Sequence, residues 1–139
     1  WLTTPQYFAL WQAVESLSQD PAIGLRMTIQ TDTSVHPPAT MSAFFARDYR
    51  DGLHRLARFK RLCTPEELTL TESGSECRIA LRWLYTDEPE PDAAADVTFA
   101  AILELGRRGT GKHITPLRVE MTRPGPVTAA CATGRRRCR

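Results

Sequence analysis

Five basic side chains recur every three or four residues between residues 47 and 61, and their types and spacing suggest a binding surface. They are Arg47, Arg50, His54, Arg58 and Arg61. Residues at these spacings share one face of an α-helix. The opposite face is apolar, with Phe45, Tyr49, Gly52, Leu53, Leu56, Phe59 and Cys63. Because a guanidinium group can hold a carboxylate through two parallel hydrogen bonds, these five residues, called the basic stripe below, are candidates for anion recognition.

The basic stripe has a structural interpretation and a functional one. In the first it is a solvated face in which Asp51 pairs with Arg47 and Arg55, each pair contributing about 0.3–0.5 kcal/mol. In the second, Arg47, Arg50 and Arg58 contact a partner domain or clamp the carboxylate of a small-molecule effector. Direct DNA binding by this helix is disfavoured because aspartates flank the arginines.

Two aromatic side chains on one predicted strand are the other binding candidates. Trp83 and Tyr85 alternate in step with Ile79 and Leu81, which predicts that all four share one strand face. Core packing explains such a face. The wall of an effector pocket explains it as well, because aromatic side chains commonly line ligand sites.

Catalytic and metal-binding patterns are missing from the sequence. His36, His54 and His113 stand alone, without metalloprotease spacing, and Gly106–Gly111 follows a predicted helix and lacks the Gly-Lys-Ser/Thr ending of a phosphate loop. The four cysteines form no CxxC pair, and we expect them to be reduced, with Cys63 and Cys77 half-buried. We therefore predict no enzyme, no metal and no cofactor.

Composition and charge indicate one ordinary globular domain. With 139 residues, 42% of them hydrophobic and 24% charged, the chain can bury a core of its own. The net charge of +2 depends on Arg135, Arg136, Arg137 and Arg139, since residues 1–134 carry 14 basic against 16 acidic side chains. The body of the domain is therefore not a polyanion binder. Its longest apolar run, residues 97–103, is too short to span a membrane, and no signal segment precedes it. We expect a cytoplasmic protein that does not contact membranes.

The predicted elements alternate between helices and short strands. Thr3 and Gln6 fit a capping box for a helix that ends near Ser18 and buries Leu10, Val14 and Leu17. Residues 23–29 alternate, which favours a strand, and residues 31–40 read as a loop. The helix of the basic stripe runs from Phe45 to Cys63, and Gly52 on its apolar face suggests a close backbone contact.

A hairpin and a crossover complete the predicted fold. Leu68–Thr71 and Cys77–Tyr85 are strands around a Ser73-Gly74 turn. A helix from Asp92 to Arg108 stops before Gly109, and Leu117–Met121 alternates as a third strand. Strand, helix and strand predict a right-handed crossover and a parallel pair. The fold class is α+β, with three N-terminal helices packed on a small mixed sheet formed by the hairpin, the crossover helix and the third strand.

Three sequence blocks together resemble a known family. They are LWQAVESLSQDPAIGL at residues 10–25, ARDYRDGLHRLARFKRLCTPEEL at residues 46–68, and LELGRRGTGKHITPLRVEMTRPGP at residues 103–126. Blocks of this kind, in this order, resemble the effector-sensing N-terminal domain of AraC/XylS-type bacterial transcriptional regulators, in the arabinose-binding-like subgroup. For residues 23–29 the resemblance favours a short helix capped by Asp20, with Pro21 at its first position, and we adopt that prediction.

The resemblance implies a function for the chain. Such domains sense a small-molecule effector and self-associate, so we expect a homodimer in the full-length protein. Promoter DNA would be bound only through a C-terminal helix-turn-helix domain, which this chain lacks. The alternative is a stand-alone small-molecule-binding domain without a DNA-binding partner.

The last residues depart from the family pattern. After residue 126 the sequence has no aromatic residue and no alternation, and it carries the arginine cluster at 135–137. We expect residues 1–126 to form the sensing domain. Because the chain starts at Trp1, we expect it to be a fragment in which this domain is partial. Residues 127–139 are expected to be a disordered tail, as a shifted reading frame would produce.

Overall fold

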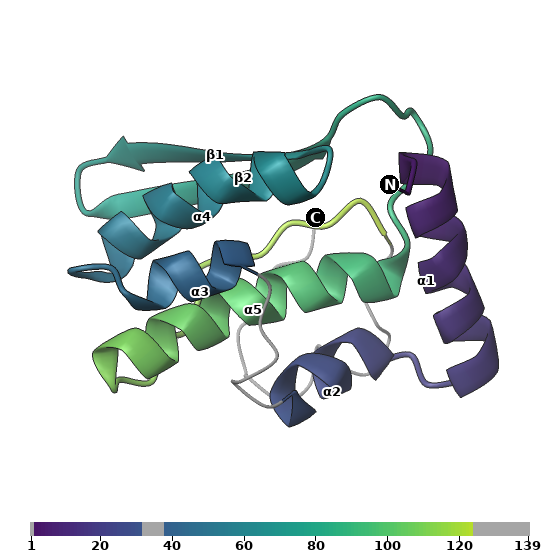
Figure 1. Cartoon of the computed structure of the whole chain (residues 1–139). Helices are drawn as coiled ribbons and strands as arrows, with labels where there is room; N and C mark the ends of the chain where they lie inside the picture. The colour runs from purple at the N-terminus through teal and green to yellow at the C-terminus, as the bar shows by residue number, and fades with distance from the viewer. Residues whose placement is uncertain (1, 32–37, 124–139) are drawn as a thin grey trace.

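The structure, a computed structural model, describes residues 2–31 and 38–123 and confirms the α+β fold class (Figure 1). Five helices and one hairpin occur in these residues, and four of the helices precede the hairpin instead of the three predicted. In chain order they are α1 (Thr4–Ser18), α2 (Ile23–Gln30), α3 (Pro38–Phe44), α4 (Tyr49–Cys63), β1 (Glu66–Ser73), β2 (Glu76–Trp83) and α5 (Asp92–Thr110). The predicted tail, residues 127–139, lies outside the described residues.

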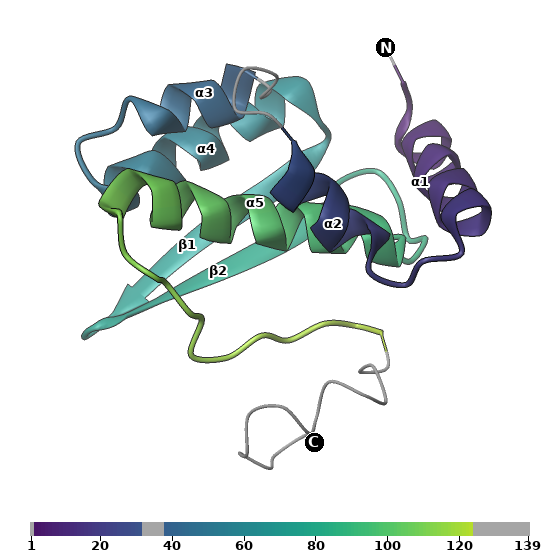
Figure 2. The ribbon, with the colours of Figure 1, turned by 90° about the horizontal axis from the view of Figure 1, so that it is seen from below.

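Helix α5 is the central element. It contacts α1, α2, α3 and α4, while α4 also packs on β1. Figures 1 and 2 show the hairpin beside α4, and α1 standing apart at the end of α5 where the chain returns from β2. The main core lies between α3, α4, α5 and the hairpin, and it is formed by Ala39, Ala43, Leu53, Leu56, Leu68, Ile102 and Leu105.

The hairpin is present as predicted, but its limits differ: Ser73 belongs to β1, the turn residues are Gly74 and Ser75, and β2 ends at Trp83 instead of Tyr85. Its strands pair antiparallel from Ser73 opposite Glu76 to Glu66 opposite Trp83. Gly74 has a φ of +58°, a conformation in which a side chain would be strained. The register also places Glu66 and Trp83 on the same face at the open end of the hairpin, because directly opposite residues point to one side.

The predicted third strand is wrong. Residues 117–121 form no strand, and the described sheet has two antiparallel strands and no parallel pair. The segment lies beside β2 only through side chains, with Arg78 Nη2 3.9 Å from Glu120 Oε2, and Leu117 is 87% exposed. Alternation identifies a segment with two different faces, but a strand also needs a backbone partner.

The helix of the basic stripe begins later than predicted. Asp48 caps α4 by accepting a hydrogen bond from the backbone N–H of Asp51 at 2.8 Å, so Arg47 precedes the helix. Phe45 is 75% exposed instead of facing the core. Residues 38–40, predicted as loop, belong to α3. The close contact predicted at Gly52 is confirmed, since a Cβ built there would lie 3.3 Å from the carbonyl oxygen of Ala43.

The remaining helices confirm the local signals and correct the packing. The capping box of α1 is present, but Leu10 and Leu17 are 54% and 86% exposed, and α1 buries Thr4 and Phe8. The helical prediction for residues 23–29 is confirmed, although α2 begins only at Ile23, after a turn in which Asp20 accepts from the N–H of Ala22. Helix α5 ends two residues later than predicted, with Gly111 as its left-handed cap.

Candidate functional site

The first half of the basic stripe is paired with acidic side chains. Asp51 lies 3.0 Å from Arg55 and 3.7 Å from Arg47. The pKa of Asp51 is lowered, chiefly by the backbone N–H of Arg47 and then by the Arg55 side chain. Glu72 of β1 lies 3.1 Å from Arg50 and 3.9 Å from His54. These contacts agree with a solvated face in which two acids bridge neighbouring cations.

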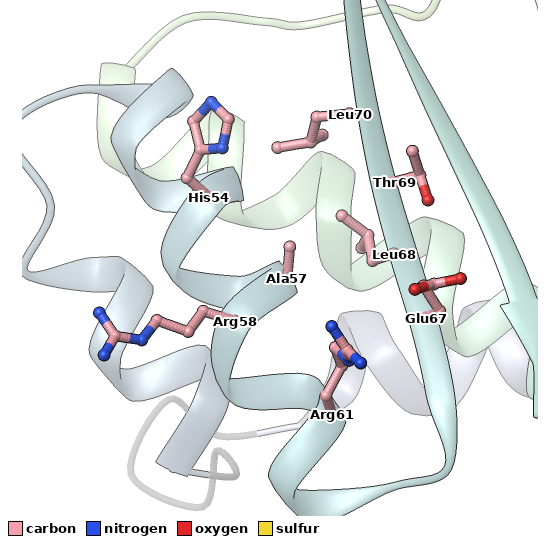
Figure 3. A pocket seen from close by; sticks show the side chains of 8 residues that line it. All are labelled: His54, Ala57, Arg58, Arg61, Glu67, Leu68, Thr69 and Leu70. Atoms are coloured by element: carbon pink, nitrogen blue, oxygen red, sulfur yellow. The ribbon is translucent and has the colours of Figure 1, made fainter.

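The second half of the stripe borders an open groove of about 390 Å³ between α4 and β1 (Figure 3). The groove is lined by His54, Ala57, Arg58, Arg61, Glu67, Leu68, Thr69 and Leu70. In Figure 3, Ala57 and Leu68 face each other across it, and Arg61 points toward Glu67. Glu67 is already paired with Arg82 at 2.9 Å. Among the described residues, neither Arg58 nor Arg61 has an ion-pair partner.

A second depression of about 430 Å³ continues the groove across the outer side of α4. Its lining consists of Asp51, His54, Arg55, Arg58 and Phe59. Arg58 extends away from β1 in Figure 3 and therefore lies between the two hollows. The surface is broad and open, whereas small-molecule sites are usually enclosed and mostly apolar. Its shape and charge fit a protein partner better than a small ligand.

The structure separates the other two sequence candidates, Trp83 and Tyr85, from the stripe and from each other. Strand β2 ends at Trp83, whose ring lies 5.3 Å from that of Tyr7 and 5.0 Å from that of Phe8. Tyr85 does not continue the strand face. It has a φ of 64° and is 89% exposed, because the chain turns away after the last hairpin pair.

A buried carboxylate beside Trp83 was not identified from the sequence. Glu66 is 1% exposed, and its Oε2 accepts from the Lys60 ammonium at 2.7 Å. Burial raises the pKa of the Glu66 carboxyl, while the Lys60 charge opposes that rise. The sequence did hold a signal, since Glu66 alternates in step with Leu68 and Leu70 and must therefore share their inward face.

A second carboxylate joins this group from the loop before α5. Burial raises the pKa of Glu90, the nearby Trp83 indole opposes the rise, and the charge of Glu66 adds to it. Burial also raises the pKa of Tyr7, and both carboxylates add to that shift. The indole and Glu90 Oε1 do not reach normal hydrogen-bond geometry. We call Tyr7, Trp11, Glu66, Trp83 and Glu90 the aromatic–carboxylate cluster.

Replacing Glu90 by glutamine should stabilise the domain increasingly as the pH rises. The folded-state pKa of Glu90 is raised above its ordinary value of 4.5, so the folded protein holds this proton more tightly than the unfolded chain. Wild-type stability therefore falls, relative to Glu90→Gln, from about pH 4.5 up through the raised pKa, and the gap is constant above it. Melting temperatures of both proteins between acid and neutral pH measure this gap.

The exposed neighbour Glu88 provides the control, because Glu88→Gln makes the same change in charge on the same loop. An equal pH dependence of the two variants would contradict the burial of Glu90 as the cause.

The described residues carry no other arrangement that suggests chemistry. They hold no cluster of three or more His, Cys, Asp or Glu side chains placed to bind a metal ion. No helix among residues 2–31 and 38–123 has the length and apolarity needed to cross a membrane. Cys63 and Cys77 are free and, contrary to the prediction, exposed. His36, Cys131 and Cys138 lie outside the described residues.

Comparison with known proteins agrees with the resemblance seen in the sequence. Residues 1–133 match the model of a family described as the arabinose-binding domain of AraC transcription regulators, N-terminal. No curated protein and no solved structure matches the chain significantly. The matched family is one of regulatory ligand-binding domains and not of enzymes. Because the match spans nearly the whole sequence, the chain belongs to the family of N-terminal arabinose-binding domains of AraC transcription regulators.

Proposed function

We propose that this chain is the ligand-sensing and self-association domain of a bacterial AraC-type transcriptional regulator. The family match over residues 1–133 is the observation that carries this proposal. A small molecule binds the domain and shifts its equilibrium between arrangements by binding one of them more tightly. In the full-length, cytoplasmic protein the domain forms a homodimer, and promoter DNA is bound by a C-terminal helix-turn-helix domain.

The basic end of α4 is suited to transmit the signal to that DNA-binding domain. Arg58 and Arg61 have no ion-pair partner among the described residues, although both border the groove along β1. Unpaired cations at an open groove favour an acidic protein surface as the partner, because complementary charges fix the orientation in which two proteins bind. The first half of the stripe lacks this property, since Asp51 and Glu72 already occupy its cations.

Replacing Arg58 and Arg61 together by glutamine should weaken the transcriptional response of the full-length regulator. Coupling energies between sites are typically about 1–3 kcal/mol, so we expect at least a roughly five-fold loss of induction. The melting temperature of the domain should hardly change, because exposed charges without partners contribute little to stability. A promoter–reporter assay and a thermal melt provide the two measurements.

The matched control replaces Arg47 and Arg50 by glutamine, which changes the charge by the same amount on the paired half of the stripe. We expect this control to keep most of the induction. If both variants induce like the wild type, the whole stripe is a solvated face and the proposed domain contact is wrong.

A further inference from the structure

The aromatic–carboxylate cluster leaves four buried polar atoms without protein partners. Two are hydrogen-bond donors, the Nε1 atoms of Trp11 and Trp83, and two are acceptors, the Oε1 atoms of Glu66 and Glu90. None of the four makes a hydrogen bond of normal geometry among the described residues, although the Trp83 indole lies near enough to Glu90, and the Trp11 indole near enough to Tyr7, to oppose the rise in the pKa of each. Buried polar groups in folded proteins are nearly always hydrogen-bonded, and each unsatisfied one is costly. Four such atoms around three aromatic rings therefore indicate a site for a ligand.

The charge of the cluster selects the kind of ligand. Glu66 and Glu90 bring two carboxylates, and Lys60 pairs with Glu66 at 2.7 Å. No described cation forms an ion pair with Glu90, although the Lys60 charge also opposes the rise in its pKa that burial causes. One lysine therefore faces two carboxylates, which leaves one negative charge in excess, and a buried unpaired charge is strongly unfavourable. A ligand with a single positive charge removes this imbalance, whereas a neutral ligand does not.

We propose that the aromatic–carboxylate cluster binds the protonated amine of a small-molecule effector that also carries an oxygen acceptor. The ammonium group, with three donors and no acceptor, donates to the free oxygens of Glu66 and Glu90. The faces of Tyr7 and Trp83, whose ring centroids lie 5.3 Å apart, stabilise the positive charge. The indole N–H groups of Trp11 and Trp83 donate to the ligand oxygen.

The position of the cluster explains how such a ligand would be sensed. Tyr7 and Trp11 belong to α1, Glu66 and Trp83 to the open end of the hairpin, and Glu90 to the loop that enters α5. Glu66 is fully buried and the other four side chains are half-buried, with the four unpartnered atoms themselves buried inside the cluster. Helix α1 has another tie to α5, since Glu15 Oε1 accepts from the N–H of Ala93 at 2.6 Å. Amine binding would therefore strengthen the contact that already joins α1 to the hairpin through the rings of Tyr7, Phe8 and Trp83.

Ethanolamine is the probe for this proposal, because it combines an ammonium group with one hydroxyl. Two of the three tryptophans of the chain, Trp11 and Trp83, lie in the cluster, so intrinsic fluorescence of the 139-residue chain reports binding. We expect a saturable change with a dissociation constant in the millimolar range or below, as a ligand of four heavy atoms permits. Calorimetry provides a second measurement that does not depend on fluorescence. Ethylene glycol, which replaces the ammonium by a hydroxyl, should bind at least about ten-fold more weakly.

The variant Glu90→Gln keeps the shape of the side chain and removes the uncompensated charge. It should weaken ethanolamine binding at least about ten-fold, while the control Glu88→Gln on the same loop should bind like the wild type. Equal binding by Glu90→Gln, or equal binding of ethylene glycol, would overturn the proposal.

This proposal rests on the sensor role proposed above in one respect, which is that it calls the bound amine the effector. The binding of an amine by the cluster can be tested separately. L-Arabinose is included in the titration because the family description names that sugar. Binding of arabinose without binding of ethanolamine rejects the amine and leaves the sensor role intact. If the chain binds ethanolamine but the full-length regulator responds to no effector, the amine site is correct and the proposed sensor role is wrong.

Discussion

Replacing Gly24 by alanine should destabilise the domain by about 2–3 kcal/mol, the upper part of the range for overpacked cores. Helix α2 lies against α5 (Figure 2), and Gly24 is a point of contact between the two helices. A Cβ at residue 24 would overlap the carbonyl oxygen of Ala93. It would also lie 3.0 Å from the Cα of Ala93 and 2.8 Å from the Cβ of Asp96. Backbone atoms cannot move aside as a side chain can, so the two helices would have to separate. Alanine's better helix propensity, worth about 1 kcal/mol, offsets only part of this loss.

Thermal melting measures the effect, which should lower the melting temperature by about 8 °C. Gly109→Ala is the matched control, because Gly109 also lies in a helix but a Cβ there would meet nothing within 4 Å. That variant should be as stable as the wild type or gain up to about 1 kcal/mol from helix propensity. Equal melting temperatures for the two variants would show that α2 does not pack on α5 through Gly24.

Features set by neighbouring residues could be predicted from the sequence. The capping box joins Thr3 and Gln6 within one turn, and the turn at Gly74 and Ser75 sets the hairpin register because its strands follow directly on either side. The close contact at Gly52 was also predictable. A glycine weakens a helix, so its place on an apolar face indicates that another backbone packs closely there. In each case the physical cause lies within a few residues.

Features that depend on distant segments were missed. The aromatic–carboxylate cluster brings together α1, the hairpin and the loop before α5, and neither Glu66 nor Glu90 carries a motif. The third strand was predicted at residues 117–121 because alternation shows two faces without showing whether a backbone partner exists. Phe8 is buried in place of Leu10 and Leu17 because it packs against Trp83. The helical periodicity of α1 gives no information on the position of Trp83.

Replacing Arg123 by alanine should destabilise the domain by about 3–5 kcal/mol, although Arg123 lies in a segment without regular structure. Its guanidinium forms a short ion pair with Asp96 of α5 and lies 3.6 Å from Asp92. Asp96 is only 2% exposed, so removing the arginine leaves a carboxylate buried without its cation. The loss of that partner, more than the loss of contact area, sets the size of the effect. Urea or thermal unfolding of the variant measures it.

A double variant distinguishes the cost of a buried unpaired charge from the cost of lost packing. If charge is the cause, adding Asp96→Asn to Arg123→Ala should recover about 1–2 kcal/mol, because an unpaired buried amide costs less than an unpaired carboxylate. Arg118→Ala is the control on the same segment. Its ion pair with Glu120 is exposed, with 79% of the arginine side chain accessible, so its loss should cost no more than about 0–1 kcal/mol. A similar small cost for Arg123→Ala would mean that residues 112–123 are not anchored on α5, and that Asp96 tolerates burial without its arginine.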